Sequence, residues 1–153
     1  MRIAVANDHA GYDLKREIKA WLEEQGHEVR DFGTHDRDSC DLSDFIVPAT
    51  RAVACSECER GIFVDGVGYG SAMIANKFRG ISACVCQDPV CAELARQHND
   101  TNVLCLGGKL IGLVLAMATV RAWMMAEPLA DERYQRRRDK LAQIDAEQTV
   151  PLT

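Results

Sequence analysis

The stretch that decides the fold is residues 61–77, GIFVDGVGYGSAMIANK. It begins with an apolar run of strand length that ends at the carboxylate of Asp65. Gly66, Gly68 and Gly70 follow at alternate positions, and the small residues after them can begin a helix. A loop without side chains brings backbone N–H groups close to an anion, and open α/β sheets bind their ligands at the carboxyl ends of strands. The stretch therefore predicts a strand, an anion-binding loop and a helix.

The sequence on both sides of this stretch alternates between strand and helix patterns. Strands are predicted over residues 2–6, 27–32, 61–64, 80–86 and 102–106. Helices are predicted over residues 12–25, 43–57, 69–77, 88–96, 110–125 and 131–146. Pro48 must lie in the first turn of its helix or kink it. This alternation predicts a three-layer α/β fold, a doubly wound parallel five-stranded sheet that is Rossmann-like or flavodoxin-like, with an extra C-terminal helix.

Length and composition are those of a single globular domain spanning residues 1–153. The hydrophobic fraction is 47%, the charged fraction is 27% and the net charge is −5, without the basic stripe that nucleic-acid binding needs. The N-terminal segment becomes polar too early for a signal peptide, and no apolar run reaches the roughly 18 residues of a membrane span. We therefore expect a cytoplasmic protein without nucleic-acid or membrane partners.

The seven cysteines favour a reducing compartment over a disulfide framework. Cys84, Cys86 and Cys105 lie in strand-like runs, where a thiol behaves as a small hydrophobe. Cys55 and Cys58 form a lone C-x-x-C pair, which has no further zinc ligands in its segment. We therefore expect ordinary thiols and no metal site.

Polar residues follow three predicted strands at the edge where their carboxyl ends meet. Asp8 and His9 follow the first strand, Asp65 ends the third, and Lys109 follows the fifth. The segment 98–100, His-Asn-Asp, precedes the fifth strand and so belongs to the opposite edge. It can join the site only by folding over or by coming from a neighbouring subunit. Each of these residues also has a plainer interpretation as a helix cap, a turn or a solvated charge.

Three motifs together resemble one family, the type B ribose-5-phosphate isomerases and the galactose-6-phosphate isomerase subunits. The motifs are Asp8-His9-Ala10-Gly11, Gly66-x-Gly68-x-Gly70 with Ala75-Asn76-Lys77, and the segment RQHNDTNVL at residues 96–104. The resemblance extends through Arg133 and Arg137 and so covers nearly the whole chain. It implies a cofactor-free aldose–ketose isomerase of carbohydrate metabolism that works through an enediolate, by default on the pentose phosphates ribose 5-phosphate and ribulose 5-phosphate.

The resemblance also implies roles for individual residues. The substrate-binding set that it implies is Asp8, His9, Gly66, Gly68, Gly70, Ser71, Asn99, Lys109, Arg133 and Arg137. Within it, the glycine-loop N–H groups face the enediolate, and His9, Arg133 and Arg137 hold the phosphate. His98 resembles the residue that opens the sugar ring. Members are homodimers or homotetramers whose sites combine residues of two subunits.

The position of the catalytic base departs from the familiar pattern. Many members have a cysteine base where this chain has Asp65, and another branch has a glutamate where it has Ser71. Val67 replaces the threonine of a Gly-Thr-Gly segment, and Leu42 stands where a tyrosine is usual. One galactose-6-phosphate isomerase subunit also resembles this chain in having aspartate at the cysteine position.

Three interpretations of Asp65 stay open. In the first, Asp65 is a replacement base and forms the catalytic pair with His98. In the second, it binds sugar hydroxyls while the base comes from elsewhere. In the third, the chain is a non-catalytic sugar-phosphate-binding subunit that needs a paralogous partner, and a capping role for Asp65 agrees with the last two. The same departures leave open a different sugar phosphate of four to six carbons.

Overall fold

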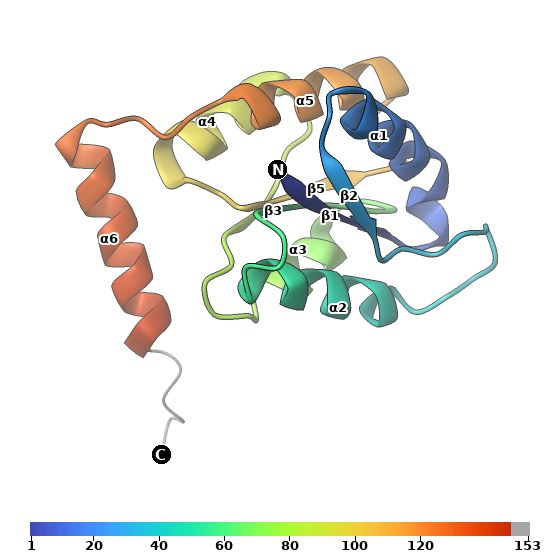
Figure 1. Ribbon diagram of the computed structural model, residues 1–153, viewed down its shortest axis with the longest axis horizontal. Helices are drawn as coiled ribbons and strands as arrows, with labels where there is room; N and C mark the ends of the chain where they lie inside the picture. The colour runs from blue at the N-terminus through green and yellow to red at the C-terminus, as the bar shows by residue number, and fades with distance from the viewer. Residues whose placement is uncertain (148–153) are drawn as a thin grey trace.

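The computed structural model describes residues 1–147 as a three-layer α/β fold (Figure 1). Its parallel strands are β1 (Arg2–Asn7), β2 (Glu28–Asp31), β3 (Arg60–Asp65), β4 (Ala83–Val85) and β5 (Val103–Gly107). Its helices are η1 (His9–Gly11), α1 (Tyr12–Glu24), α2 (Leu42–Ala54), α3 (Tyr69–Ala75), α4 (Pro89–Asn99), α5 (Leu113–Met125) and α6 (Glu132–Glu147). The predicted fold class is confirmed. The predicted single domain includes residues 148–153, which lie outside the described residues, and it stays a prediction.

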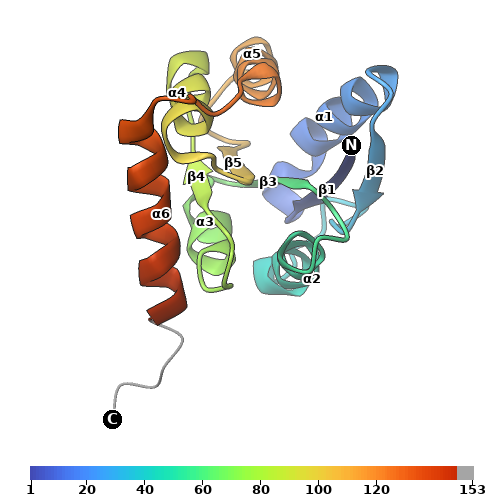
Figure 2. The ribbon, with the colours of Figure 1, turned by 60° about the vertical axis from the view of Figure 1, so that its left-hand side comes forward.

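Two apolar cores cover the two faces of the sheet. Ile3 and Ile62 point from neighbouring strands toward α1, α4 and α5, whereas Ala4 and Phe63 point toward α2 and α3. This alternation follows from the two-residue period of a strand. Figures 1 and 2 show the resulting layers, and they show α6 standing beside the β4 edge rather than over the sheet. None of the helices in residues 1–147 has the length and apolar character needed to cross a membrane.

The strand order β2-β1-β3-β5-β4 determines which strand ends are neighbours. It differs from the flavodoxin-like order 2-1-3-4-5 by an exchange of the last two strands. In this register Asn7 lies opposite Val64, and Asp65 lies opposite Gly107. The segments that follow β1, β3 and β5 therefore meet at one edge of the sheet.

Several element boundaries differ from those predicted. The α4 helix continues to Asn99, and Asp100 ends it with a left-handed backbone at φ 51°. The β4 strand begins only at Ala83, because Gly80 has a positive φ of 78° and the Ser82 N–H donates to the Asn102 side chain at 2.8 Å rather than to a neighbouring strand. Pro48 lies inside α2, which excludes the first-turn position. The helix accepts the loss of one backbone hydrogen bond there because its apolar face is buried.

A buried ion pair joins α1 to β2. The Lys15 ammonium lies 2.9 and 2.8 Å from the two carboxylate oxygens of Asp31 and 3.3 Å from the carbonyl oxygen of Thr34. Burial raises the pKa of Asp31, but hydrogen bonds from Lys15 and from the Gly33 N–H outweigh it, so that the net pKa is lowered. Because Asp31 also accepts the Gly33 N–H, the pair holds the start of the loop before α2.

Replacing Lys15 by Met should lower the free energy of unfolding by about 3 kcal/mol at pH 7, since it leaves the Asp31 carboxylate without its main partner. Because the folded-state pKa of Asp31 is lowered, this stabilisation is present above the unfolded pKa of about 3.9 and is lost as the pH falls through the folded value. Urea unfolding at pH 7 and at pH 3 measures both effects. Lys19→Met is the control, because the Lys19 side chain is 35% exposed and lies 3.4 Å from Asp31. Its replacement should lower the free energy of unfolding by less than about 1 kcal/mol. An equal loss at both pH values would contradict an electrostatic origin.

Candidate active site

The carboxylate of Asp65 is the centre of the loop that follows β3. Its Oδ1 accepts the N–H groups of Val67 at 2.8 Å and Gly68 at 2.5 Å. Its Oδ2 accepts the N–H of Ser71 at 2.8 Å and the Ser71 hydroxyl at 2.6 Å. Asp65 is 3% exposed, so these four donors replace the water that a carboxylate otherwise requires. The capping interaction considered for Asp65 is therefore present.

The glycine loop packs closely against β5. Gly68 has φ 85°, and a Cβ atom there would lie 3.0 Å from Val85 Cγ1 and 3.1 Å from the carbonyl carbon of Leu106. Two backbone bonds join the ends of β3 and β5, from Gly108 N–H to Asp65 O at 2.7 Å and from the Lys109 N–H to the Gly66 oxygen at 3.1 Å. The positive φ favours glycine at position 68, and a Cβ atom there would also crowd both neighbours.

Asp8 and His9 lie beside this loop, at the end of β1. Oδ1 of Asp8 accepts the N–H groups of Ala10 at 2.9 Å and Gly11 at 3.1 Å and so caps η1. The His9 Nδ1 lies 3.4 Å from the backbone nitrogen of Cys40, which donates to it. With Nδ1 as acceptor, Nε2 carries the proton and is the donor available to an anion. Sequence reasoning could not predict the Cys40 contact, because 31 residues separate it from His9.

The carboxyl edge of the sheet therefore brings together one part of the predicted site, which we call the first group. It consists of Asp8, His9, Asp65, Gly66, Gly68, Gly70, Ser71 and Lys109. Leu42 covers this group, since a Cβ atom at Gly70 would lie 2.7 Å from Leu42 Cδ2 and 3.6 Å from Asp65 Oδ2. An apolar side chain thus borders the glycine loop.

A second group gathers around Tyr134 of α6. The ring of His98 stacks on that of Tyr134 with centroids 4.4 Å apart and an interplanar angle of 11°. The guanidinium carbons of Arg133 and Arg137 lie 4.7 and 5.6 Å from the centre of the same ring. We define the second group as His98, Asn99, Arg133, Tyr134 and Arg137. Sequence reasoning missed Tyr134, because a lone aromatic residue in a charged helix carries no periodic signal.

A buried network fixes the turn that carries His98 and Asn99. Arg96 donates to the Asp100 carboxylate at 2.5 Å and to the Thr101 carbonyl at 2.7 Å. The Trp123 indole N–H donates to Thr101 Oγ1 at 2.9 Å, and the guanidinium groups of Arg96 and Arg60 lie 5.8 and 5.4 Å from the Trp123 ring. These contacts hold the end of α4 against α5.

The structure does not bring the two groups together within one protomer. The first group follows the carboxyl ends of β1, β3 and β5, whereas His98 and Asn99 end the helix that leads into the amino end of β5. At about 3.3 Å per residue, the five residues of β5 span roughly 16 Å. The predicted placement of His98 at the opposite edge is confirmed.

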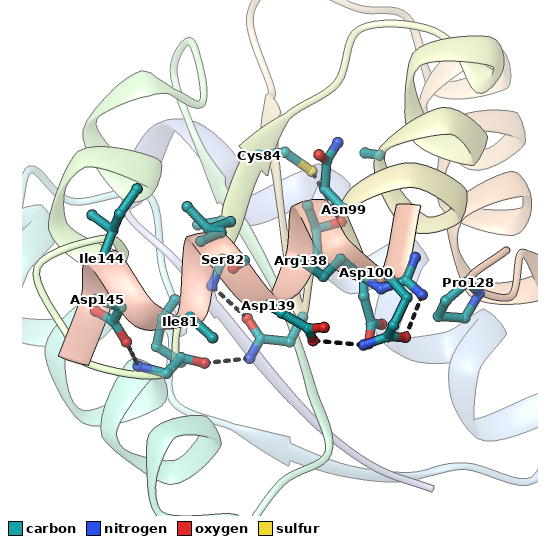
Figure 3. A pocket seen from close by; sticks show the side chains of 18 of the residues that line it. Ile81, Ser82, Cys84, Asn99, Asp100, Pro128, Arg138, Asp139, Ile144 and Asp145 are labelled. Carbon is teal, nitrogen blue, oxygen red and sulfur yellow. Dashed lines mark hydrogen bonds between the residues drawn. The ribbon is translucent and has the colours of Figure 1, made fainter. Parts of the chain in front are cut away.

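A cavity of about 1040 Å³ adjoins the second group (Figure 3). It lies between α6, the β4 edge and the turn after α4, and its walls include Ser82, Cys84, Asn99, Arg138 and Asp139. The glycine loop does not line it. The cavity therefore borders only the half of the predicted site that contains Asn99.

The described residues contain no group of three His, Cys, Asp or Glu side chains arranged to hold a metal ion. The C-x-x-C pair is split between environments, with Cys55 exposed and Cys58 buried. Burial raises the pKa of the Cys58 thiol, which disfavours the thiolate that a metal would need.

Comparison with known proteins identifies the family. A sequence profile of the family described as Ribose/Galactose Isomerase matches residues 3–141. The chain belongs to this family. It is 43% identical to ribose-5-phosphate isomerase B of Escherichia coli (strain K12), over 94% of this chain and 96% of that protein.

Solved structures of ribose/galactose isomerases share the fold along nearly the whole chain. Ribose-5-phosphate isomerase B of Clostridium thermocellum has a TM-score of 0.92 and 43% identity, covering 96% of this chain and 99% of that one. The enzyme of Mycoplasma genitalium, solved with bound ribulose-5-phosphate, has a TM-score of 0.90 and 33% identity, covering 95% and 97%. The two groups therefore lie on a fold that binds a sugar phosphate in a relative.

Replacing Gly68 by Ala should cost more stability than replacing Gly26, and the difference measures how tightly the loop packs on β5. Both glycines have positive φ, 85° and 79°, but a Cβ atom at Gly26 meets nothing within 4 Å. Gly26→Ala should therefore cost only the backbone strain of about 1–2 kcal/mol, whereas Gly68→Ala should cost at least about 1 kcal/mol more through crowding. Urea unfolding of both variants tests this, and equal losses would contradict close packing of the loop.

Proposed function

We propose that this chain is a cofactor-free aldose–ketose isomerase that interconverts ribose 5-phosphate and ribulose 5-phosphate through an enediolate. The observation that carries the proposal is the first group, in which a glycine loop, a carboxylate and a histidine meet at the carboxyl edge of the sheet. Relatives that share the fold bear the name of this activity, and one of them binds ribulose-5-phosphate. The chemistry needs a base, donors for the developing oxyanion and a cationic grip on phosphate.

Asp65 is proposed as the base, in the place that the family resemblance implies for a cysteine base. In the described conformation its four hydrogen bonds occupy the carboxylate oxygens. Three of the donors are backbone N–H groups, but the fourth is the Ser71 hydroxyl, which turns away by rotation of one side-chain bond. When that hydroxyl turns to a substrate oxygen, Oδ2 keeps only its bond from the Ser71 N–H, and its other lone pair can take the proton from the carbon beside the carbonyl.

The remaining donors of the loop are proposed to stabilise the enediolate. The N–H groups of Val67, Gly68 and Ser71 are directed at Asp65. Those of Gly66 and Gly70 are not among its donors, and we assign them to the substrate oxygens together with the Ser71 hydroxyl. Donors held in place before the reaction stabilise a developing negative charge without reorganisation.

Phosphate binding and ring opening are proposed to need a second copy of the chain. His9 and Lys109 belong to the first group, whereas His98, Asn99, Arg133 and Arg137 belong to the second, at the opposite edge of the sheet. In a two-fold dimer, the second group of one protomer faces the first group of its partner and makes two equivalent sites. Tyr134 then presents the two arginines and His98 as one unit. A paralogous chain is the alternative source of the second group.

Asp65→Asn should lower kcat by about 10²–10⁴-fold, as expected when a general base is lost. Ser71→Ala keeps the carboxylate and removes only one donor, so its loss should be about tenfold. The measurements are kcat with ribose 5-phosphate and uptake of solvent deuterium at the carbon beside the carbonyl.

Three outcomes would count against these roles or this substrate. Equal losses in Asp65→Asn and Ser71→Ala would show that Asp65 acts only by holding the loop. If the unchanged protein binds several aldose and ketose phosphates of four to six carbons but exchanges deuterium with none, it is a binding subunit. Activity confined to a sugar phosphate other than ribose 5-phosphate would assign the first group, which Leu42 borders, to that substrate.

Mixing two inactive variants tests the shared site. Asp65→Asn damages the first group and Arg137→Ala the second, so each homodimer is impaired at both sites. In a randomly mixed population, half of the dimers carry one intact site, which predicts about a quarter of the original activity. Refolding the variants together and assaying the mixture gives the result, with each variant refolded alone as the control. No recovery would mean that both groups act within one protomer or that a paralogous chain is required.

A further inference from the structure

Two thiols of the β4 segment touch each other outside the proposed active site. Cys84 Sγ and Cys86 Sγ lie 3.5 Å apart, and the Cys86 thiol donates to the Cys84 sulfur. Residues two apart in an extended segment point to the same side, which is why the thiols meet. A disulfide has a sulfur–sulfur distance of about 2.05 Å. The two sulfurs must therefore approach by roughly 1.5 Å, and because residues two apart in a strand lie about 6.6 Å apart, the backbone around Val85 must bend to bring the Cα atoms to the usual disulfide spacing.

The surroundings of the two thiols differ, so that Cys84 is the nucleophile and Cys86 is the hydrogen-bond donor to it. The hydrogen bond from Cys86 lowers the pKa of Cys84, and Thr101 and the Arg96 guanidinium add to this effect against burial. For Cys86, the bond to Cys84 and burial both raise the pKa. Because the thiolate is the reactive form, Cys84 is the sulfur that attacks an electrophile.

Only one of the two thiols faces open space. Cys84 lines the cavity between α6 and the β4 edge, and Figure 3 shows its sulfur there. Cys86 is 2% exposed and lies in the core beneath α4 and α5. A small neutral oxidant that enters the cavity therefore meets Cys84 first.

We propose that Cys84 and Cys86 form a hydroperoxide-sensitive dithiol that closes reversibly to a disulfide. The Cys84 thiolate attacks one peroxide oxygen, the O–O bond breaks, and the other oxygen leaves and takes a proton from the solvent to form water or an alcohol. The resulting Cys84 sulfenic acid is attacked by the Cys86 sulfur. The S–O bond breaks, the Cys86 proton leaves with the hydroxyl group as water, and the S–S bond forms. The peroxide is reduced, and the two thiols are oxidised by two electrons.

The disulfide acts on the turn that carries His98 and Asn99. Cys84 Sγ lies 3.5 Å from Thr101 Oγ1, which also accepts the indole N–H of Trp123. Moving the Cys84 sulfur toward Cys86 withdraws it from Thr101 and loosens this junction. Displacement of a catalytic group by about 1 Å can cost up to 10²-fold in rate. Oxidation should therefore lower isomerase activity by about tenfold or more, an effect that rests on the proposed function.

Mass spectrometry tests the disulfide without any assay of activity. The reduced full-length protein is treated with a small molar excess of hydrogen peroxide, alkylated and digested with trypsin. The peptide of residues 80–96 should lose two hydrogens and resist alkylation at Cys84 and Cys86, and dithiothreitol should reverse both changes. That peptide also contains Cys91, which is exposed. The peptide of the Cys91→Ser variant should therefore also lose two hydrogens. If it does not, the disulfide involves Cys91, and the assignment to Cys84 and Cys86 is wrong.

Two further variants separate the roles of the thiols. Cys86→Ser should stop at a Cys84 sulfenic acid that dimedone labels, and Cys84→Ser should show neither label nor disulfide in this peptide. The isomerase activity of the wild-type protein should fall on oxidation and return with dithiothreitol. The Cys84→Ser variant should keep its activity through the same peroxide treatment. A disulfide that forms without a change in activity would overturn the link to the His98 turn while leaving the proposed function intact. Failure of the peptide to lose hydrogens in the unchanged protein would overturn the dithiol itself.

Discussion

The hydrogen bonds at the Asp65 carboxylate are the interaction on which the carboxyl edge of the sheet depends. A carboxylate that is 3% exposed costs several kcal/mol unless its oxygens are bonded. The requirement is met by donors from the next six residues, so the chain must turn back over the end of β3. That turn gives Gly68 its positive φ and presses the loop onto β5, where Gly108 bonds the backbone oxygen of Asp65. One buried charge thus shapes the glycine loop.

The parallel sheet imposes a second constraint. All five strands run in the same direction, so residues after strands and residues before strands lie at opposite edges. The first group follows strands, and the second group precedes β5 or lies on α6. A single protomer therefore holds two separated halves of the predicted site. Figure 2 shows α6 beside the β4 edge, outside the two helix layers that cover the sheet.

Element type was predictable, and the ends of elements were less so. The periodic apolar residues of α1 and the apolar runs of β1, β3 and β5 agree with the structure because burial imposes these patterns directly. The end of α4 and the start of β4 differ, since they depend on Asp100 adopting a left-handed backbone and on the Asn102 side chain accepting the Ser82 N–H. A side chain that bonds a backbone group on another segment leaves no periodic mark in the sequence.

The sequence by itself determined the fold class, the family resemblance and the strand ends at which the polar residues of the first group would gather. Only the tertiary structure decided that four donors surround Asp65, that Tyr134 stacks on His98 and that Cys40 contacts His9. The physical reason is the distance along the chain over which each interaction acts. Periodicity and turn chemistry act between neighbours along the chain, whereas these contacts depend on side-chain rotamers and on the packing of segments that the sequence keeps apart.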